Sequence, residues 1–197
     1  MNTVKKGNDF ENKVFSYITT ELLNERLHVN SKRSEVYQKK GYFSKERQSE
    51  IITDISIETF LPDASGSDYC LLTIIECKDY KTRIPVNDIE EFHSKIQQIA
   101  GDNVKAIFVT SAALQESAFE YAKSKKIGVI RYLPDNQVER LLCFKMNSDN
   151  AQTKLSHSEF NSAFLNQSHK SDGREFYACD EKYIYPSLFS VLSEYLN

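Results

Sequence analysis

Apolar residues recur at helical spacing near the start of the chain. Four of them fall on one stripe of a helix and indicate one buried face. Asn8 precedes this stripe and Glu11 follows Asn8 by three residues, so the pair predicts a capping box at the start of the helix. The stripe consists of Phe10, Val14, Ile18 and Leu22.

Three segments rich in β-branched and aromatic residues follow, and each predicts a strand. They are "VYQKKGY" (36–42), "IITDISIE" (51–58) and "CLLTIIECK" (70–78). The intervening "TFLPDASGSD" contains Pro, Gly, Ser and Asp, which are typical of turns. We therefore expect the second and third strands to form an antiparallel hairpin.

The next part of the chain alternates helical and strand patterns. A helix opens at "PVNDIEEF", where Asn87 and Glu90 predict a second capping box. A strand is expected at 104–110, a helix at about 113–125 and a strand at "IGVIRYL" (127–133). The order α-β-β-β-α-β-α-β predicts an α/β fold, a mixed sheet flanked by helices.

The composition changes near Met146. Residues 147–173 are rich in Ser, Asn, Gln and His, whereas "EFYACDEKYIYPSLFSVLSEYL" is again apolar and aromatic. We interpret 1–146 as the folded domain, 147–175 as a polar linker and 176–197 as a docking or interaction element.

Bulk composition narrows the class of protein. The chain has 197 residues, 40% hydrophobic and 27% charged, as in an ordinary globular domain. No apolar run is long enough for a membrane helix and no secretory signal opens the chain, so we expect a cytoplasmic protein without a membrane partner. The four cysteines show no metal-binding spacing and are interpreted as reduced, buried residues. A net charge of −3 means that any nucleic-acid contact must come from a local basic patch.

Two acidic positions stand out in the second and third predicted strands. Asp54 lies in the middle of one strand, where Asp is rare and costly to bury unpaired. Glu76 ends the next strand, with Lys78 on the same face because strand side chains alternate. Two carboxylates held close together need a cation between them, and hard oxygen ligands favour Mg²⁺. Lys78 would then orient a water and stabilise charge in the transition state.

Glu11 is a third candidate acid. It points into the apolar stripe of the first helix, where a lone carboxylate is costly. It either turns back to cap its own helix or meets a partner in the core, and a cation shared with Asp54 and Glu76 would be such a partner.

These residues and their order resemble the PD-(D/E)XK nuclease superfamily. "GNDFENKVF", "IECKDY", "KAIFVTS" and "IGVIRY" are similar to the Mrr-like restriction endonuclease branch, over about residues 7–133. The resemblance implies that Asp54, Glu76, Glu11 and the backbone carbonyl of Cys77 bind metal, and that Lys78 is the catalytic lysine. In one departure, Thr53 stands where the family often has Pro.

The resemblance also implies a function. It suggests Mg²⁺-dependent hydrolysis of DNA phosphodiester bonds, with Mn²⁺ as a substitute, in defence against foreign DNA. The alternatives are an RNA or single-strand nuclease on the same fold, or a non-catalytic nucleic-acid-binding or scaffold module. Cutting both strands usually needs two active sites, so a homodimer or a partner protein bound through residues 147–197 is expected.

The candidate site residues also have purely structural interpretations. Asp54 could lie on a solvated sheet face, and Glu76 with Lys78 could form a surface ion pair of little energetic weight. His93 and Gln97 border the apolar face of the helix that opens at "PVNDIEEF", and their side chains could face the site. Basic residues near the active face could hold phosphates or merely be solvated. These residues are Lys39, Lys40, Lys45, Arg47, Lys81 and Arg83.

Overall fold

A computed structural model shows a mixed α/β fold. It describes residues 3–25, 30–61, 69–101, 104–134, 139–141, 164–168, 177–179 and 184–185. The helices are α1 (Thr3–Leu23), α2 (Val86–Ala100) and α3 (Glu116–Ser124), with a short 3-10 helix at Ser31–Arg33. The strands are β1 (Ser34–Gln38), β2 (Gly41–Ser44), β3 (Ser49–Ile52), β4 (Ile55–Phe60), β5 (Tyr69–Lys78), β6 (Lys105–Thr110), β7 (Gly128–Pro134), β8 (Glu139–Leu141), β9 (Tyr177–Cys179) and β10 (Ile184–Tyr185).

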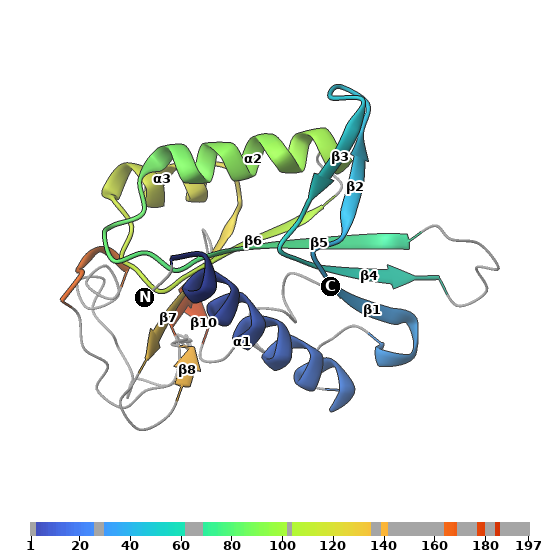
Figure 1. Ribbon diagram of the computed structural model, residues 1–197, viewed down its shortest axis with the longest axis horizontal. Coiled ribbons are helices and arrows are strands. Elements are labelled where there is room, and N and C mark those ends of the chain that lie inside the picture. Colours follow the sequence, from blue (N-terminus) through green and yellow to red (C-terminus); the bar gives the residue numbers. More distant parts are fainter. Residues whose placement is uncertain are drawn as a thin grey trace, which may run out of the picture.

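The five strands β1, β4, β5, β6 and β7 lie side by side in that order. β1, β4 and β5 pair antiparallel, whereas β5, β6 and β7 pair parallel. Figure 1 shows α2 and α3 on one side of these strands and α1 on the other. The expected order α-β-β-β-α-β-α-β in a sheet flanked by helices is confirmed.

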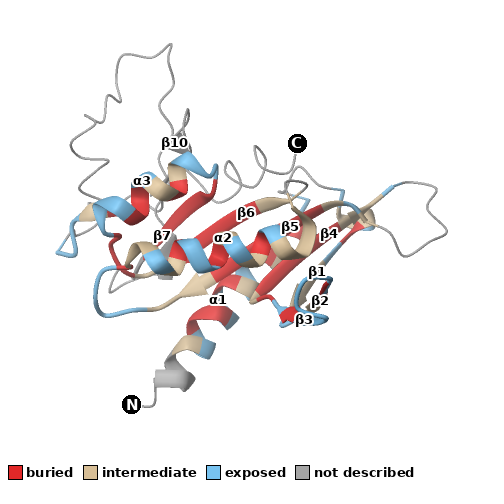
Figure 2. Cartoon of the chain, turned by 90° about the horizontal axis from the view of Figure 1, so that it is seen from above, coloured by how far each residue is buried: buried red, intermediate tan, exposed pale blue. Residues whose placement is uncertain are grey.

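The core lies between the sheet and the helices (Figure 2). β5 is covered on both faces, and its second half is a continuous buried run from Leu72 to Glu76. α1 contributes all four members of its predicted apolar stripe to this core. Burial on both faces explains why the central parts of β5 and β6 are mostly apolar, as in parallel sheets.

Two of the predicted strands are each broken near the middle. β1 and β2 are separated by Lys39 and Lys40, and β4 and β3 by Thr53 and Asp54. Gln38 pairs with Ile55 and Gly41 with Ile52, so no residue is gained or lost on either strand. The two breaks are therefore one bend in a single antiparallel ribbon, whose outer half (β2 and β3) leaves the sheet and rises beside α2 (Figure 1).

Hydrogen bonds join the two sides of this bend. The Lys39 amide donates to the Asp54 carbonyl at 3.0 Å, and the Thr53 amide donates to the Lys40 carbonyl at 2.9 Å. Lys39 has φ of 55°, a left-handed conformation that costs a residue with a Cβ roughly 1–2 kcal/mol. The prediction that Asp54 lies in the middle of a strand is wrong: it lies at the bend.

Both predicted helix caps are wrong. α1 begins at Thr3, so Asn8 and Glu11 lie inside the helix and Glu11 does not cap it. α2 begins at Val86 after Pro85, whose fixed φ suits a helix start, and Pro85 makes no side-chain cap bond. Among the described cysteines, Cys70 is exposed rather than buried as expected.

Residues 164–168 pack onto the sheet and helices although they follow the end of β7 by some thirty positions. Phe164 is fully buried, and its ring stacks on Phe119 of α3 with the centroids 5.8 Å apart. The Phe164 carbonyl accepts a hydrogen bond from the Leu114 amide, and β9 pairs with β7. The division at 146 and 175 stays a prediction. No helix among the described residues is long and apolar enough to cross a membrane.

Candidate active site

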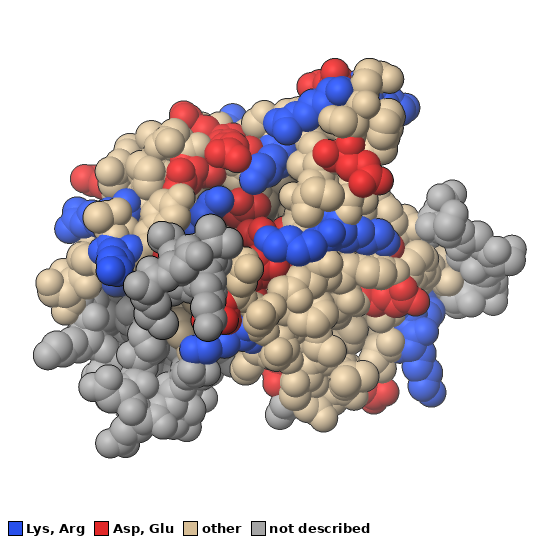
Figure 3. Space-filling model, viewed as in Figure 1, with Lys and Arg blue, Asp and Glu red and all other residues tan. Residues whose placement is uncertain are grey.

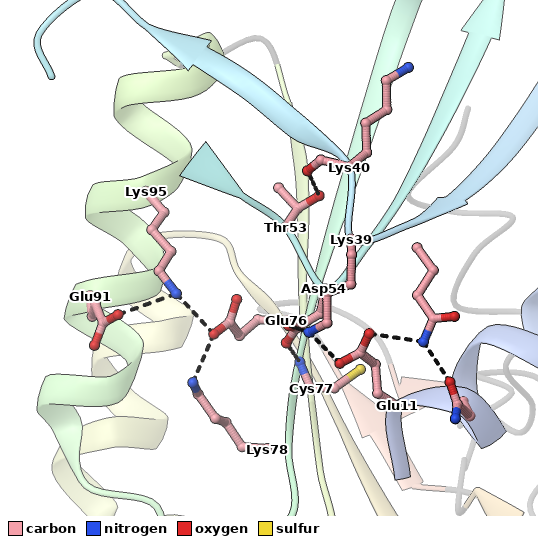
Figure 4. Close-up of polar contacts among 12 residues, drawn as sticks. Glu11, Lys39, Lys40, Thr53, Asp54, Glu76, Cys77, Lys78, Glu91 and Lys95 are labelled. Carbon is pink, nitrogen blue, oxygen red and sulfur yellow. Dashed lines mark hydrogen bonds and ion pairs between the residues drawn. The ribbon is translucent and has the colours of Figure 1, made fainter. Parts of the chain in front are cut away.

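The acidic residues meet where the ribbon bends beside the end of β5. Glu11 reaches this place from α1, Asp54 from the bend and Glu76 from β5. Figure 4 shows Asp54 between Glu76 on one side and Glu11 on the other. Glu11 and Glu76 are each only 4% exposed. Charged groups so deeply buried need partners, and the partners are lysines.

The first group of partners, the Lys39 cluster, consists of Glu11, Lys39 and Asp54. The Lys39 ammonium lies 2.5 Å from Glu11 Oε2 and 2.6 Å from Asp54 Oδ1. Burial acts to lower the pKa of Lys39, but its hydrogen bonds to Asp54 and Glu11 more than reverse this, and the pKa is raised. One cation thus joins a helix-borne carboxylate to the carboxylate at the bend.

The remaining oxygens of these two carboxylates are held by neutral donors. Gln38 Nε2 donates to Glu11 Oε1 at 2.9 Å, and the backbone amide of Cys77 donates to Asp54 Oδ2 at 2.9 Å. The Cys77 amide is available because β4 begins only at Ile55, which pairs with Ile75, so β5 extends beyond its antiparallel partner there. Each carboxylate is therefore fixed at one oxygen and faces the cation with the other.

The second group, the Glu76 cluster, consists of Glu76, Lys78 and Lys95. Lys78 Nζ lies 2.8 Å and Lys95 Nζ 3.2 Å from the same oxygen of Glu76. Lys95 comes from α2, where Glu91 one turn earlier also contacts it at 3.2 Å. Burial acts to lower the pKa of Lys78, but the Glu76 carboxylate outweighs burial, so the pKa is raised. Lys78 is an ammonium at neutral pH.

The two clusters lie on either side of β5. Cys77 points toward α1, on the side opposite Glu76 and Lys78, as strand alternation requires. Burial, together with the nearby charges of Asp54 and Glu11, raises the pKa of the Cys77 thiol, so the side chain is an unreactive neighbour. Its amide, not its sulfur, takes part in the site.

The space-filling view shows the charge arrangement on the surface. Acidic atoms run through the centre of this face and basic atoms border them (Figure 3). In the part of the chain that the structure describes, no three Asp, Glu, His or Cys side chains are grouped to hold a metal ion. The ammonium groups take the positions between the carboxylates, so the acids are paired with lysines rather than with one another.

The structure brings together some predicted residues and separates others. Glu11, Asp54, Glu76, Cys77 and Lys78 all contribute to the two clusters. His93 and Gln97 do not: the His93 ring meets Tyr121 of α3, and Gln97 Nε2 is 3.5 Å from the Gly101 carbonyl.

Among the basic residues predicted near the site, Lys39, Lys40 and Arg47 are each paired in the structure. Lys39 joins the Lys39 cluster, and Lys40 pairs with the buried Glu58 at 2.6 Å. Arg47 donates to Gln98 of α2, which ties the outer ribbon to that helix. Sequence reasoning missed Gln38 and Lys95 altogether. Neither carries a motif signal, although Lys95 stands four residues after Glu91, a common ion-pair spacing.

Comparison with known proteins identifies the family. A family model described as "Restriction endonuclease", the Mrr catalytic domain, matches residues 11–133. No curated protein matches the chain.

The chain is similar to parts of two solved structures. One is a protein of unknown function, AF1548, with 16% identity and a TM-score of 0.40, covering 57% of this chain and 53% of that one. The other is a repair endonuclease from Pyrococcus abyssi, with 17% identity and a TM-score of 0.36, covering 60% of this chain and 46% of that one. The chain thus spans about half of each. The family match, which takes in Glu11, the bend and the end of β5, shows that the chain belongs to the Mrr-type restriction endonuclease family of nucleases.

Proposed function

We propose that the chain is a divalent-metal-dependent endonuclease that hydrolyses phosphodiester bonds of DNA. The observation that carries the proposal is the Lys39 cluster: two carboxylates from distant parts of the chain share one cation beside the end of β5. The match to a nuclease family over residues 11–133 supports the same function.

The residues present fit a hard divalent cation. Glu11 and Asp54 each offer an oxygen that already faces a positive charge, and Glu76 lies on the other side of Asp54 (Figure 4). Mg²⁺ and Mn²⁺ favour such oxygen ligands. The carbonyl of Cys77 is a further candidate, because the N–H and C=O of a strand residue point to the same side and the Cys77 N–H points at Asp54. When bound, the cation would neutralise phosphate charge and make a water more acidic.

The chain's own cations would do the remaining work. Lys78 is held next to Glu76 as an ammonium, where it can stabilise negative charge that develops on the phosphate oxygens. Lys95 helps to fix Glu76 from α2 and so positions it. Gln38 and the Cys77 amide hold Glu11 and Asp54 in place before a substrate binds, which lowers the reorganisation needed for reaction.

Plasmid cleavage with a charge-removing variant tests the proposal. Supercoiled plasmid, linear duplex, single-stranded DNA and RNA would be incubated with Mg²⁺, with Mn²⁺ or with EDTA. We expect duplex DNA to be cut only with metal, and Lys78→Ala to lower the rate by about 10²–10³-fold, as for loss of one transition-state donor. Lys123→Ala is the matched control, because Lys123 pairs with Glu120 on the exposed side of α3.

Several outcomes would contradict the proposal. Cleavage by correctly folded Lys78→Ala at the wild-type rate would remove the role of this lysine. Cleavage in EDTA would remove the metal, and cleavage of RNA alone would replace DNA as the substrate. Binding of DNA in EDTA without any cleavage in metal would indicate a non-catalytic module.

A role in defence against foreign DNA rests on the family match alone. It is tested by expressing the wild-type chain and Lys78→Ala in a bacterial host and exposing both to phage. Equal plaque numbers would argue against it.

A further inference from the structure

We infer that Lys39 is a built-in competitor of the divalent cation: its ammonium holds the metal-binding oxygens of Glu11 and Asp54 until the cation displaces it. The inference rests on the proposed function, since it assigns a metal to these two carboxylates. Lys39 would accordingly set the metal concentration at which the site becomes occupied.

Within the described residues, Lys39 contacts the one oxygen of each carboxylate that receives no other hydrogen bond. Glu11 Oε1 accepts from Gln38 and Asp54 Oδ2 accepts from the Cys77 amide. Lys39 contacts the other oxygen of each carboxylate, Oε2 and Oδ1. If the ammonium leaves, both carboxylates remain oriented by their neutral donors. An ammonium and a metal cation cannot share these two oxygens, because like charges repel at this separation.

The charged groups of the site differ in exposure. The side chain of Lys39 is 50% exposed, whereas the side chains of Glu11 and Asp54, taken without their backbone atoms, are 6% and 19% exposed. The two lysines of the Glu76 cluster are much more enclosed, at 23% for Lys78 and 21% for Lys95. Among these three ammonium groups, Lys39 is the one that can turn into water without breaking core packing.

The backbone of Lys39 stays in place when its side chain leaves the site. Its amide is bonded to the Asp54 carbonyl across the bend, and its left-handed φ is fixed by the ribbon on both sides. The ammonium therefore stays at high local concentration next to the site and returns when the metal leaves. The metal ion binds only the state in which the Lys39 ammonium has left the two carboxylates. Removing the competing state, in which the ammonium is bound, must therefore tighten metal binding.

Titration of the metal alone into the whole chain tests the inference. Mg²⁺ and, separately, Mn²⁺ would be titrated calorimetrically into wild type, Lys39→Met, Lys39→Arg and the control Lys123→Met, at constant pH and ionic strength. Met and Arg are unbranched at Cβ like Lys, so they carry a similar backbone cost at this φ. Loss of two ion pairs to buried partners should make Lys39→Met bind metal about tenfold more tightly. Lys39→Arg and Lys123→Met should stay near the wild-type Kd.

Thermal unfolding adds a readout that a purely structural lysine would not reproduce. Without metal, Lys39→Met should melt at a lower temperature than wild type, because Glu11 and Asp54 then repel each other. With saturating metal, its melting temperature should rise by more than that of wild type.

The outcomes separate this inference from the proposed function. Metal binding by wild type with an equal or weaker affinity in Lys39→Met would overturn the competitor role and leave the metal site in place. No metal binding by wild type or by any variant would overturn the metal site, and the role of Lys39 with it.

Discussion

Truncation of Phe164 to alanine tests whether residues 164–168 belong to the folding unit. Phe164 lies outside the region that the family model matches, yet its side chain is fully buried among core residues. Its neighbour Gln167 ties two loops together, accepting from the Ala113 amide at 3.0 Å and donating to the Lys81 carbonyl at 3.3 Å. The segment thus holds loops that follow β5 and β6.

The expected cost follows from burial and ring stacking. An aromatic side chain buries roughly 150–250 Å², which at about 25 cal/mol per Å² corresponds to about 4–6 kcal/mol of lost transfer free energy. Measured Phe→Ala substitutions in cores cost about 3–5 kcal/mol, which includes the cavity left behind. The stacked pair with Phe119 is worth about 1 kcal/mol of this total. Since domains are stable by only about 5–15 kcal/mol, Phe164→Ala should remove a large fraction of the free energy of unfolding.

Urea unfolding followed by circular dichroism measures this loss. With a slope of about 2 kcal/mol per M, we expect the midpoint to fall by about 2 M. Phe43→Ala is the matched control, because Phe43 of β2 is 58% exposed and its truncation should leave the midpoint almost unchanged. A double-mutant cycle with Phe119→Ala should return the ring-stacking energy. If Phe164→Ala and Phe43→Ala shifted the midpoint equally, the segment would not be part of the core.

Two further predictions concern single side chains, a buried hydroxyl and two thiols of different exposure. Tyr42→Phe removes the hydroxyl that donates to Glu58 and lies 2.8 Å from Ser56 Oγ, so it should lower the free energy of unfolding by about 1–3 kcal/mol; an unchanged thermal midpoint would show that this hydroxyl contributes nothing. Iodoacetamide at neutral pH should modify the exposed Cys70 well before Cys77, whose pKa burial raises. Peptide mapping by mass spectrometry would show this order, and similar rates at both thiols would contradict it.

The sequence was enough to predict the elements that carry the site, because their patterns are local. The apolar stripe of α1 and the β-branched run of β5 follow from residues close together in the chain. "IECK" at the end of β5 was visible as a charged pair on a buried strand. The strand at 51–58 was also recognisable, but its bend was not: Thr53 and Asp54 sit between Ile52 and Ile55, and nothing local favours a break there.

The side-chain contacts of the candidate site could not be predicted from the sequence, because they depend on how distant elements are placed against one another. Lys39 meets Asp54 because the ribbon bends with the two residues opposite each other, which depends on register and not on composition. Gln38 meets Glu11, 27 positions away, only because β1 lies along α1. Phe164 lies in a short apolar run, 163–165, between polar residues, which is too short for a periodic signal of its burial. The helix starts were predicted wrongly because residue type alone favours Asn8 as an N-cap. The position at which a helix begins also depends on tertiary packing.

The unbroken pairing through the bend has a consequence for changes in chain length. One extra residue between Gln38 and Gly41 would invert the alternation of the outer ribbon, turning Tyr42 outward to solvent while the half within the sheet kept its place. Lengthening the tip between Ser44 and Ser49 would disturb neither half. Natural or engineered insertions should therefore be tolerated at the tip of the outer ribbon and should prevent correct folding at the bend.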